Sequence, residues 1–111
     1  MRELPHPATE DIQLTQVMHA LSDPARLEIV ARLADGDENC TVIGNGIELH
    51  KSTLSHHYRV LREAGLTRTT ADGRSRLVRL RRDDLNDRFP GLLDSVLAAL
   101  RSPSERALRI P

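Results

Sequence analysis

The segment HKSTLSHHYRVLREAGL, residues 50–66, predicts an amphipathic helix over 52–64 that ends at Gly65. At 100° per residue, one side of this helix is apolar, and the other is short-chained, polar and mostly basic. The apolar side consists of Leu54, Tyr58, Leu61 and Ala64, flanked by His57 and Val60. The polar side consists of Ser52, Ser55, His56, Arg59 and Glu63, with Lys51 and Arg62 at its margin. One face is therefore expected to pack inward, and the other to meet something acidic.

The adjacent histidines His56 and His57, with Cys40 upstream, raise the alternative of a metal site. Adjacent helix positions point about 100° apart, whereas metal-binding helices use i, i+4 spacing, so the pair is poorly placed to hold one ion. We expect His56 to contact DNA or phosphate, with a solvated position or a metal ligand as alternatives. His57, on the apolar flank, is expected to be half-buried and to bridge the helix to backbone or phosphate. Cys40 is expected to be an inert thiol rather than a redox or metal sensor.

Two helices are predicted before this segment. Thr9 is a plausible N-cap for a helix over 10–21, whose apolar stripe is Leu14, Val17, Met18 and Leu21. In SDPARLEIVARLADG, Asp23 is placed to cap a second helix that Gly36 ends, and its predicted inward residues are Leu27, Val30, Ala31 and Ala34. Residues 1–8 are expected to form an extended arm, and residues 37–50 at most a short helix near 39–45.

A β-hairpin is predicted after the segment, over 66–81. Asp72-Gly73 is a strong turn signal between a β-prone run and an alternating run, and Arg74 and Arg76 lie at or beside the tip. Residues 84–101 then indicate one helix or two, because Pro90 interrupts the pattern. The apolar stripe of this region is Leu92, Leu93, Val96, Leu97 and Leu100. The tail 102–111 is expected to be flexible.

The order of these elements predicts one domain over 1–111, mainly α with a small β-hairpin (α+β), in a winged helix-turn-helix arrangement. The helix-turn-helix is expected over 39–64 and the wing over 66–81. A helix fits the major groove of DNA, where base edges offer hydrogen-bond patterns to Ser, Arg and His. A hairpin tip reaches the neighbouring backbone or minor groove, where arginines meet a negative potential.

The distribution of charge supports a polyanionic partner. The net charge is zero, yet residues 49–82 carry nine basic and two acidic side chains, while residues 1–48 carry three basic and nine acidic ones. A solvated charged face is the alternative interpretation. Aromatic residues make up only 2% of the chain, so a stacking platform for single-stranded nucleic acid is nearly excluded. A single cysteine, no long apolar run and no signal-like start favour a cytoplasmic protein without a membrane span.

The motifs ALSDPARLEIVARL, STLSHHYRVLREAGL and TTADGRSRLVRL together resemble the ArsR/SmtB family of bacterial winged-helix repressors over roughly residues 14–82. This resemblance implies a homodimer, paired through its first and last helices (10–21 and 84–101), on a palindromic double-stranded DNA operator. It implies DNA reading by Ser52, Thr53, Ser55, His56 and Arg59, with wing arginines Arg74 and Arg76. The full expected DNA-contacting set adds Lys51, His57, Arg62 and Arg68. The expected dimer interface is Leu14, Val17, Met18, Leu92, Leu93, Val96, Leu97 and Leu100.

The effector motifs of that family are missing from this sequence. The region ENCTVIGNG has one thiol where the metalloid-sensing branch has a Cys-x-Cys pair, and Phe89–Arg101 has no histidine and one carboxylate, Asp94. We therefore expect no bound metal or cofactor, and control by a partner protein or by abundance. A nickel-, zinc- or cobalt-responsive repressor with atypical ligands is the alternative, and a protein–protein adaptor on the same scaffold is an alternative of another class. An enzyme is not expected, since no nucleophile–base set, phosphate loop or dinucleotide fingerprint is present.

Overall fold

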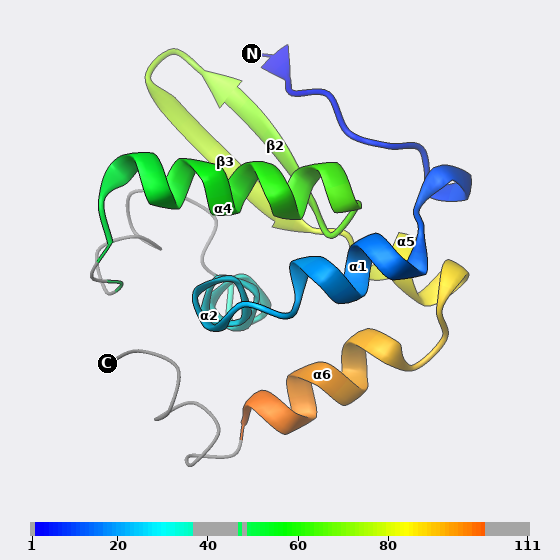
Figure 1. Cartoon of the computed structure of the whole chain (residues 1–111). Coiled ribbons are helices and arrows are strands. Elements are labelled where there is room, and N and C mark those ends of the chain that lie inside the picture. Colours follow the sequence, from blue (N-terminus) through cyan, green and yellow to red (C-terminus); the bar gives the residue numbers. More distant parts are fainter. Residues whose placement is uncertain (1, 37–46, 48, 102–111) are drawn as a thin grey trace.

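The computed structural model describes residues 2–36, 47 and 49–101. The short helix predicted near 39–45, Cys40 and the tail 102–111 lie outside the described residues. The order of elements confirms the predicted class, mainly α with a small sheet (Figure 1). In chain order the elements are β1 (Arg2–Glu3), the 3-10 turn η1 (Thr9–Asp11), α1 (Leu14–Ala20), α2 (Pro24–Ala34), α4 (Lys51–Ala64), β2 (Thr67–Asp72), β3 (Ser75–Leu80), α5 (Arg82–Arg88) and α6 (Leu92–Leu100).

Helix α2 begins as its sequence predicts. The Asp23 side chain accepts hydrogen bonds from the backbone amides of Ala25 and Arg26, and Pro24 occupies the first turn, where an N–H would have no helical partner. The helix is buried more fully than one stripe would suggest. Ile29 and Leu33 are buried along with Val30 and Ala31, whereas Leu27 and Ala34 are only half-buried.

Helix α4 ends at Gly65, as predicted, and the glycine is required there twice over. Its φ of 92° lies in the left-handed region that side chains other than glycine rarely adopt. A Cβ at this position would also lie 2.6 Å from Cγ1 of Ile12. The Leu66 amide donates to the Leu61 carbonyl across the end of the helix, which closes the terminus and directs the chain into β2.

The first predicted helix, 10–21, is two pieces in the structure. Residues 9–11 form η1, and α1 begins only at Leu14. Ile12 between them is extended and fully buried, because its side chain packs against Gly65 at the end of α4. Thr9 caps no helix. Its hydroxyl donates instead to the carboxylate of Asp84, at 2.9 Å.

The region 84–101, predicted to form one helix or two, forms two, α5 and α6. Gly91, with a φ of 83°, follows Pro90 at the break, and neither residue continues a helix comfortably. Asp83 lies inside α5, which has Arg81 at its N-cap position and no side-chain cap hydrogen bond there. The buried residues of α6, Leu93, Leu97 and Leu100, complete an aliphatic core.

The predicted arm, 1–8, turns out to be part of the wing. Its first residues form β1, which pairs antiparallel with β2, so the wing is a three-stranded sheet of order β1-β2-β3 instead of a two-stranded hairpin. The Leu4 amide extends the pairing by donating to the Thr69 carbonyl at 2.9 Å, and the Leu4 side chain is buried. Figure 1 shows the arm passing from η1 to the side of the hairpin.

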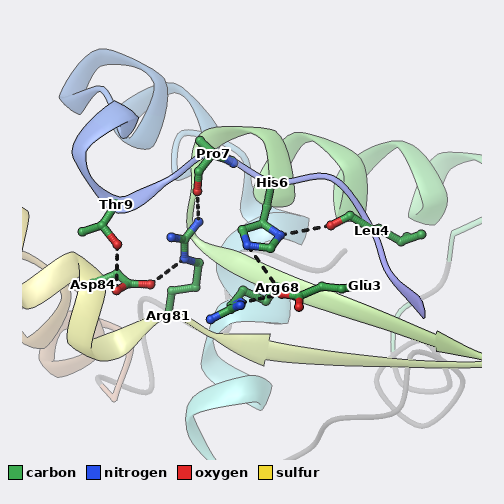
Figure 2. A network of polar contacts seen from close by, with 8 residues as sticks. All are labelled: Glu3, Leu4, His6, Pro7, Thr9, Arg68, Arg81 and Asp84. Atoms are coloured by element: carbon green, nitrogen blue, oxygen red, sulfur yellow. Dashed lines mark hydrogen bonds and ion pairs between the residues drawn. The ribbon is translucent and has the colours of Figure 1, made fainter. Parts of the chain in front are cut away.

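A chain of polar contacts fixes the arm along its length (Figure 2). Arg68 of β2 donates to the Glu3 carboxylate at 2.7 Å, and this hydrogen bond lowers the pKa of Glu3. Near the base of the wing, buried Arg81 donates to the Pro7 carbonyl at 2.7 Å and to the Asp84 carboxylate at 2.8 Å. The hydrogen bond from Arg81, followed by the one from Thr9, lowers the pKa of Asp84 against the opposing effect of burial.

Candidate nucleic-acid interface

The polar side of α4 is exposed as predicted. Its exposed members are Lys51, Ser52, Ser55, His56, Arg59 and Glu63, and Thr53 is half-buried. The opposite side buries Leu54, His57, Leu61 and Ala64 against the core, with Tyr58 and Val60 half-buried. Burial of one side fixes the rotation of the helix, so the short hydroxyl and basic side chains project together from the other.

The wing presents its arginines at the tip. The strands pair from Thr67 opposite Leu80 to Asp72 opposite Ser75, and Gly73 makes the turn with a φ of 62°. Arg74 in the turn and Arg76 at the start of β3 are both exposed. Figure 1 shows the hairpin tip extending past α4. The predicted helix face and the predicted wing tip are thus exposed together.

The basic residues divide by their partners into two groups. Arg68, Arg81, Arg82 and Arg88 donate to a carboxylate or a backbone carbonyl elsewhere in the chain. Within the described ranges, Lys51, Arg59, Arg74 and Arg76 form no ion pair with a carboxylate, which leaves their charge available to a partner. The expected DNA contact of Arg68 competes with its 2.7 Å bond to Glu3. Arg62, at the margin of the polar side of α4, is only half-exposed.

His57 lies on the buried side of α4 and belongs to a network that sequence reasoning did not find. Its side chain is in the core, and its Nδ1 lies 3.1 Å from Nη1 of Arg26, which is itself buried. Arg26 also donates from Nε to the Ala20 carbonyl at 2.7 Å and from Nη2 to the His19 carbonyl at 3.3 Å. The end of α1, the start of α2 and the middle of α4 therefore meet at one guanidinium. We call Arg26 and His57 the buried pair.

The chemistry of this pair requires a neutral imidazole. Arginine only donates, so Nδ1 of His57 must accept, and the proton of the neutral ring is then on Nε2, which lies 4.0 Å from the Asp23 carboxylate. Burial lowers the pKa of His57, and the nearby charges of Arg26 and His56 lower it further, against the opposing effect of Asp23. The sequence predicts that His57 is half-buried and bridges the helix to backbone or phosphate, and the predicted partner is wrong. The ring is buried, it meets Arg26, and it is not available to DNA.

The residues expected at a dimer interface are in two different environments. Val17, Leu93, Leu97 and Leu100 are buried within the chain's own core. Leu14 and Met18 are 48% and 52% exposed on one side of α1, and Leu92 and Val96 are half-buried on α6. Only the second group presents apolar surface to another molecule. The i, i+4 spacing of Leu14 and Met18 places them on the same side of their helix.

The described residues contain neither a cluster of metal ligands nor a membrane-spanning helix. Across 2–36, 47 and 49–101, no group of three or more His, Cys, Asp or Glu side chains is arranged to hold a metal ion. None of the helices in these ranges has the length and apolarity to cross a bilayer.

Known proteins share this arrangement. A family model for a helix-turn-helix domain matches residues 21–70. The uncharacterized HTH-type transcriptional regulator YceK of Bacillus subtilis (strain 168) is 39% identical over 90 residues, which are 79% of this chain and 90% of YceK. The solved structure of an ArsR-like transcriptional regulator from Rhodococcus sp. RHA1 has a TM-score of 0.58 at 26% identity, covering 79% of this chain and 89% of that one. The chain belongs to the ArsR family of winged-helix transcriptional regulators.

Two further comparisons extend the match. The Biofilm growth-associated repressor of Agrobacterium fabrum (strain C58 / ATCC 33970) is 29% identical over 105 residues, which are 93% of this chain and 86% of that protein. The crystal structure of the ArsR family regulator RHA00566 has a TM-score of 0.64 at 22% identity, which supports the fold. The resemblance inferred from the motifs is confirmed, as is the winged helix-turn-helix fold. The protein is a DNA-binding transcriptional regulator and not an enzyme.

Proposed function

We propose that this ArsR-family regulator is a homodimeric repressor that binds a palindromic operator through the exposed side of α4 and the wing tip. The observation that carries the proposal is the group of exposed cations Lys51, Arg59, Arg74 and Arg76, none of which pairs with a carboxylate in the described part of the chain. Double-stranded DNA offers a dense row of phosphates to such a surface. A bacterial regulator of this kind acts in the cytoplasm.

In this proposal α4 enters the major groove with its exposed side. Ser55, His56 and Arg59 face base edges, since hydroxyl, imidazole and guanidinium groups match the donors and acceptors there. Ser52, Thr53 and Lys51, in the first turn, contact the flanking backbone. The two α4 helices of a dimer then lie roughly 34 Å apart, one turn of DNA, on one face of the duplex.

The dimer is proposed to use the exposed apolar side chains of α1 together with α6. Leu14 and Met18 are large, apolar and about half exposed, which costs free energy in water unless a second surface covers them. Replacing both with Glu should give a monomer by sedimentation velocity, while the fold and its circular dichroism remain. A matched double change at exposed polar positions of the same helix, Thr15→Glu with Gln16→Glu, should leave the dimer intact.

The DNA contacts are tested by mobility shift with duplexes taken from the region upstream of the gene. Arg59→Ala should weaken binding by roughly tenfold or more, because a dimer loses two base contacts of about 1–3 kcal/mol each. Arg76→Ala should weaken it by roughly tenfold through the loss of two phosphate contacts. Arg101→Ala, exposed at the end of α6, is the control and should bind as the wild type does. Unchanged affinity in both Arg59→Ala and Arg76→Ala would overturn the docking geometry.

For regulation we propose a partner protein or changes in abundance, with no metal or cofactor at the DNA-binding domain. The support is the sequence itself, which lacks the Cys-x-Cys pair and the ligand-bearing last helix of the metal-sensing branches. Calorimetric titration with nickel, zinc and cobalt tests this directly. Micromolar or tighter binding that also changes DNA affinity would establish the atypical metal-responsive alternative instead.

A further inference from the structure

The N-terminal arm places an arginine beside the wing tip. In the register of the sheet, Arg2 of β1 pairs with Ala71 of β2, and Ala71 in turn pairs with Arg76 of β3. Residues paired across antiparallel strands lie on the same face of a sheet, with neighbouring strands about 4.8 Å apart. Arg2 and Arg76 therefore lie in one row on one face, with their Cα atoms roughly 10 Å apart.

The face that carries this row is the face on which the helices pack. Thr69 and Val78, two positions from Ala71 and Arg76 along their strands, share that face and are buried, in contact with the helical layer. Towards the tip the hairpin extends past α4 (Figure 1), and there Arg2 and Arg76 are exposed. Both side chains thus lie on the side of the sheet against which α4 packs.

On the opposite face of the sheet, by contrast, an arginine of β2 pairs with a carboxylate of the arm. There Arg68 lies directly across from Arg79, an unfavourable pairing of like charges, and Glu3 of the arm bonds to Arg68 at 2.7 Å. Successive residues of a strand alternate faces, so the arm presents Glu3 to that face and Arg2 to the other. No described carboxylate pairs with Arg2, which leaves its charge available.

We infer that Arg2 is a DNA-contacting residue of the wing, and that it forms with Arg74 and Arg76 a three-arginine group that binds the phosphate backbone beside the groove entered by α4. This rests on the proposed docking of α4 and the wing. Nothing in the helix-turn-helix motif or the hairpin signal assigns a role to the arm.

The arm is held firmly enough for such a contact to be reproducible. The Leu4 amide and buried side chain anchor it against β2, while the bonds of Arg81 to the Pro7 carbonyl and of Thr9 to Asp84 hold it at the base of the wing (Figure 2). A contact made from a fixed strand loses less conformational entropy on binding than one made from a flexible tail.

The test measures how binding depends on salt. Wild type, Arg2→Gln, Arg2→Lys and Arg101→Gln, each with the affinity tag at the C-terminus, are titrated by fluorescence anisotropy at several salt concentrations. The probes are a duplex of about 30 base pairs selected from a random pool by the wild-type protein, and a mixed-sequence duplex of the same length. Arg2→Gln leaves the strand's backbone hydrogen bonds in place, and thermal unfolding verifies that the fold is unchanged.

We expect Arg2→Gln to weaken binding roughly tenfold near 0.1 M salt, by a similar factor on both duplexes, and to reduce the salt slope by about 0.9 for each protomer. Arg2→Lys should retain the slope, and Arg101→Gln should match the wild type. A slope unchanged in Arg2→Gln overturns the inference, whether or not affinity falls, because a purely structural role would not alter it. If Arg59→Ala and Arg76→Ala weaken binding while Arg2→Gln does not, the inference alone fails. If none of the three has an effect, the proposed docking fails with it.

Discussion

His56 and His57 are neighbours in α4, yet they belong to opposite regions of the molecule. His56 is exposed on the polar side of the helix, among the cations that have no carboxylate partner in the described structure. His57 is buried, and its Nδ1 accepts from Arg26. The same division applies to the arginines, since Arg26 bonds three elements together whereas Arg59 projects into solvent. The role of each histidine and arginine therefore depends on the contacts that the fold gives it and not on its residue type.

The two regions differ in how much a substitution should cost the stability of the fold. An exposed cation can be exchanged at little cost to folding, because water solvates its replacement. The buried pair cannot, because loss of Arg26 leaves the His57 ring nitrogen and the Ala20 carbonyl without this donor, and loss of His57 leaves a guanidinium N–H without its acceptor. Each of the following changes should affect one region and not the other.

The largest effect is expected from Arg26→Ala. It removes the donor to His57 and to the carbonyls of Ala20 and His19, so the free energy of unfolding should fall by about 3 kcal/mol. Urea unfolding at one fixed protomer concentration measures it, because a dimer's stability depends on concentration. Arg59→Ala is the matched control and should change stability by less than about 0.5 kcal/mol. A loss of similar size in both variants would remove the distinction between the two regions.

A smaller effect is expected from the two histidines. His57→Ala should lower the free energy of unfolding by about 2 kcal/mol, because it leaves a cavity and an unsatisfied guanidinium. His56→Ala should change it by less than about 0.5 kcal/mol and should weaken DNA binding instead. The pair of variants is compared by urea unfolding and by anisotropy on the same duplex. Weaker DNA binding in His56→Ala together with lost stability would show that His56 has a structural contact as well.

The sequence predicts the exposed side of α4 and the wing better than it predicts the buried pair. The exposed side of α4 and the wing arginines follow from the helical period and from a strong turn signal, both of which are local. The ends of α2 and α4 follow from Asp23, Pro24 and Gly65 for the same reason. These features depend on residues close together in the chain, so one sequence is enough to find them.

What the sequence did not reveal depends on contacts between distant residues. Arg26 and His57 are 31 positions apart, and Thr9 and Asp84 are 75 apart. The arm's strand is two residues long, too short for any alternating pattern, and it forms only because β2 offers an unpaired edge. The break at Ile12 has the same origin, since it follows from packing against Gly65 and not from any residue that disfavours helix.

The smallest effect is expected from pH, and it isolates the buried pair. Because the pKa of His57 is lowered from its ordinary value of 6.5, the unfolded chain binds a proton at this position more readily than the folded one. His57 therefore contributes stability that is fully present above about pH 6.5 and is lost as pH falls towards the folded pKa. A protonated ring would also place a donor against the Arg26 guanidinium, so the loss of stability should arise at the contact between α2 and α4.

The measurement is urea unfolding from pH 7.5 to 5, in wild type and in His57→Gln. Glutamine offers Arg26 an acceptor oxygen and does not titrate, so the difference between the two proteins removes the contribution of the other histidines. The difference in the free energy of unfolding should increase steadily as the solution becomes more acidic, because wild type loses more stability than His57→Gln. A difference that stays constant across this range would mean that the ring titrates as it does in the unfolded chain, and that burial beside Arg26 does not keep it neutral.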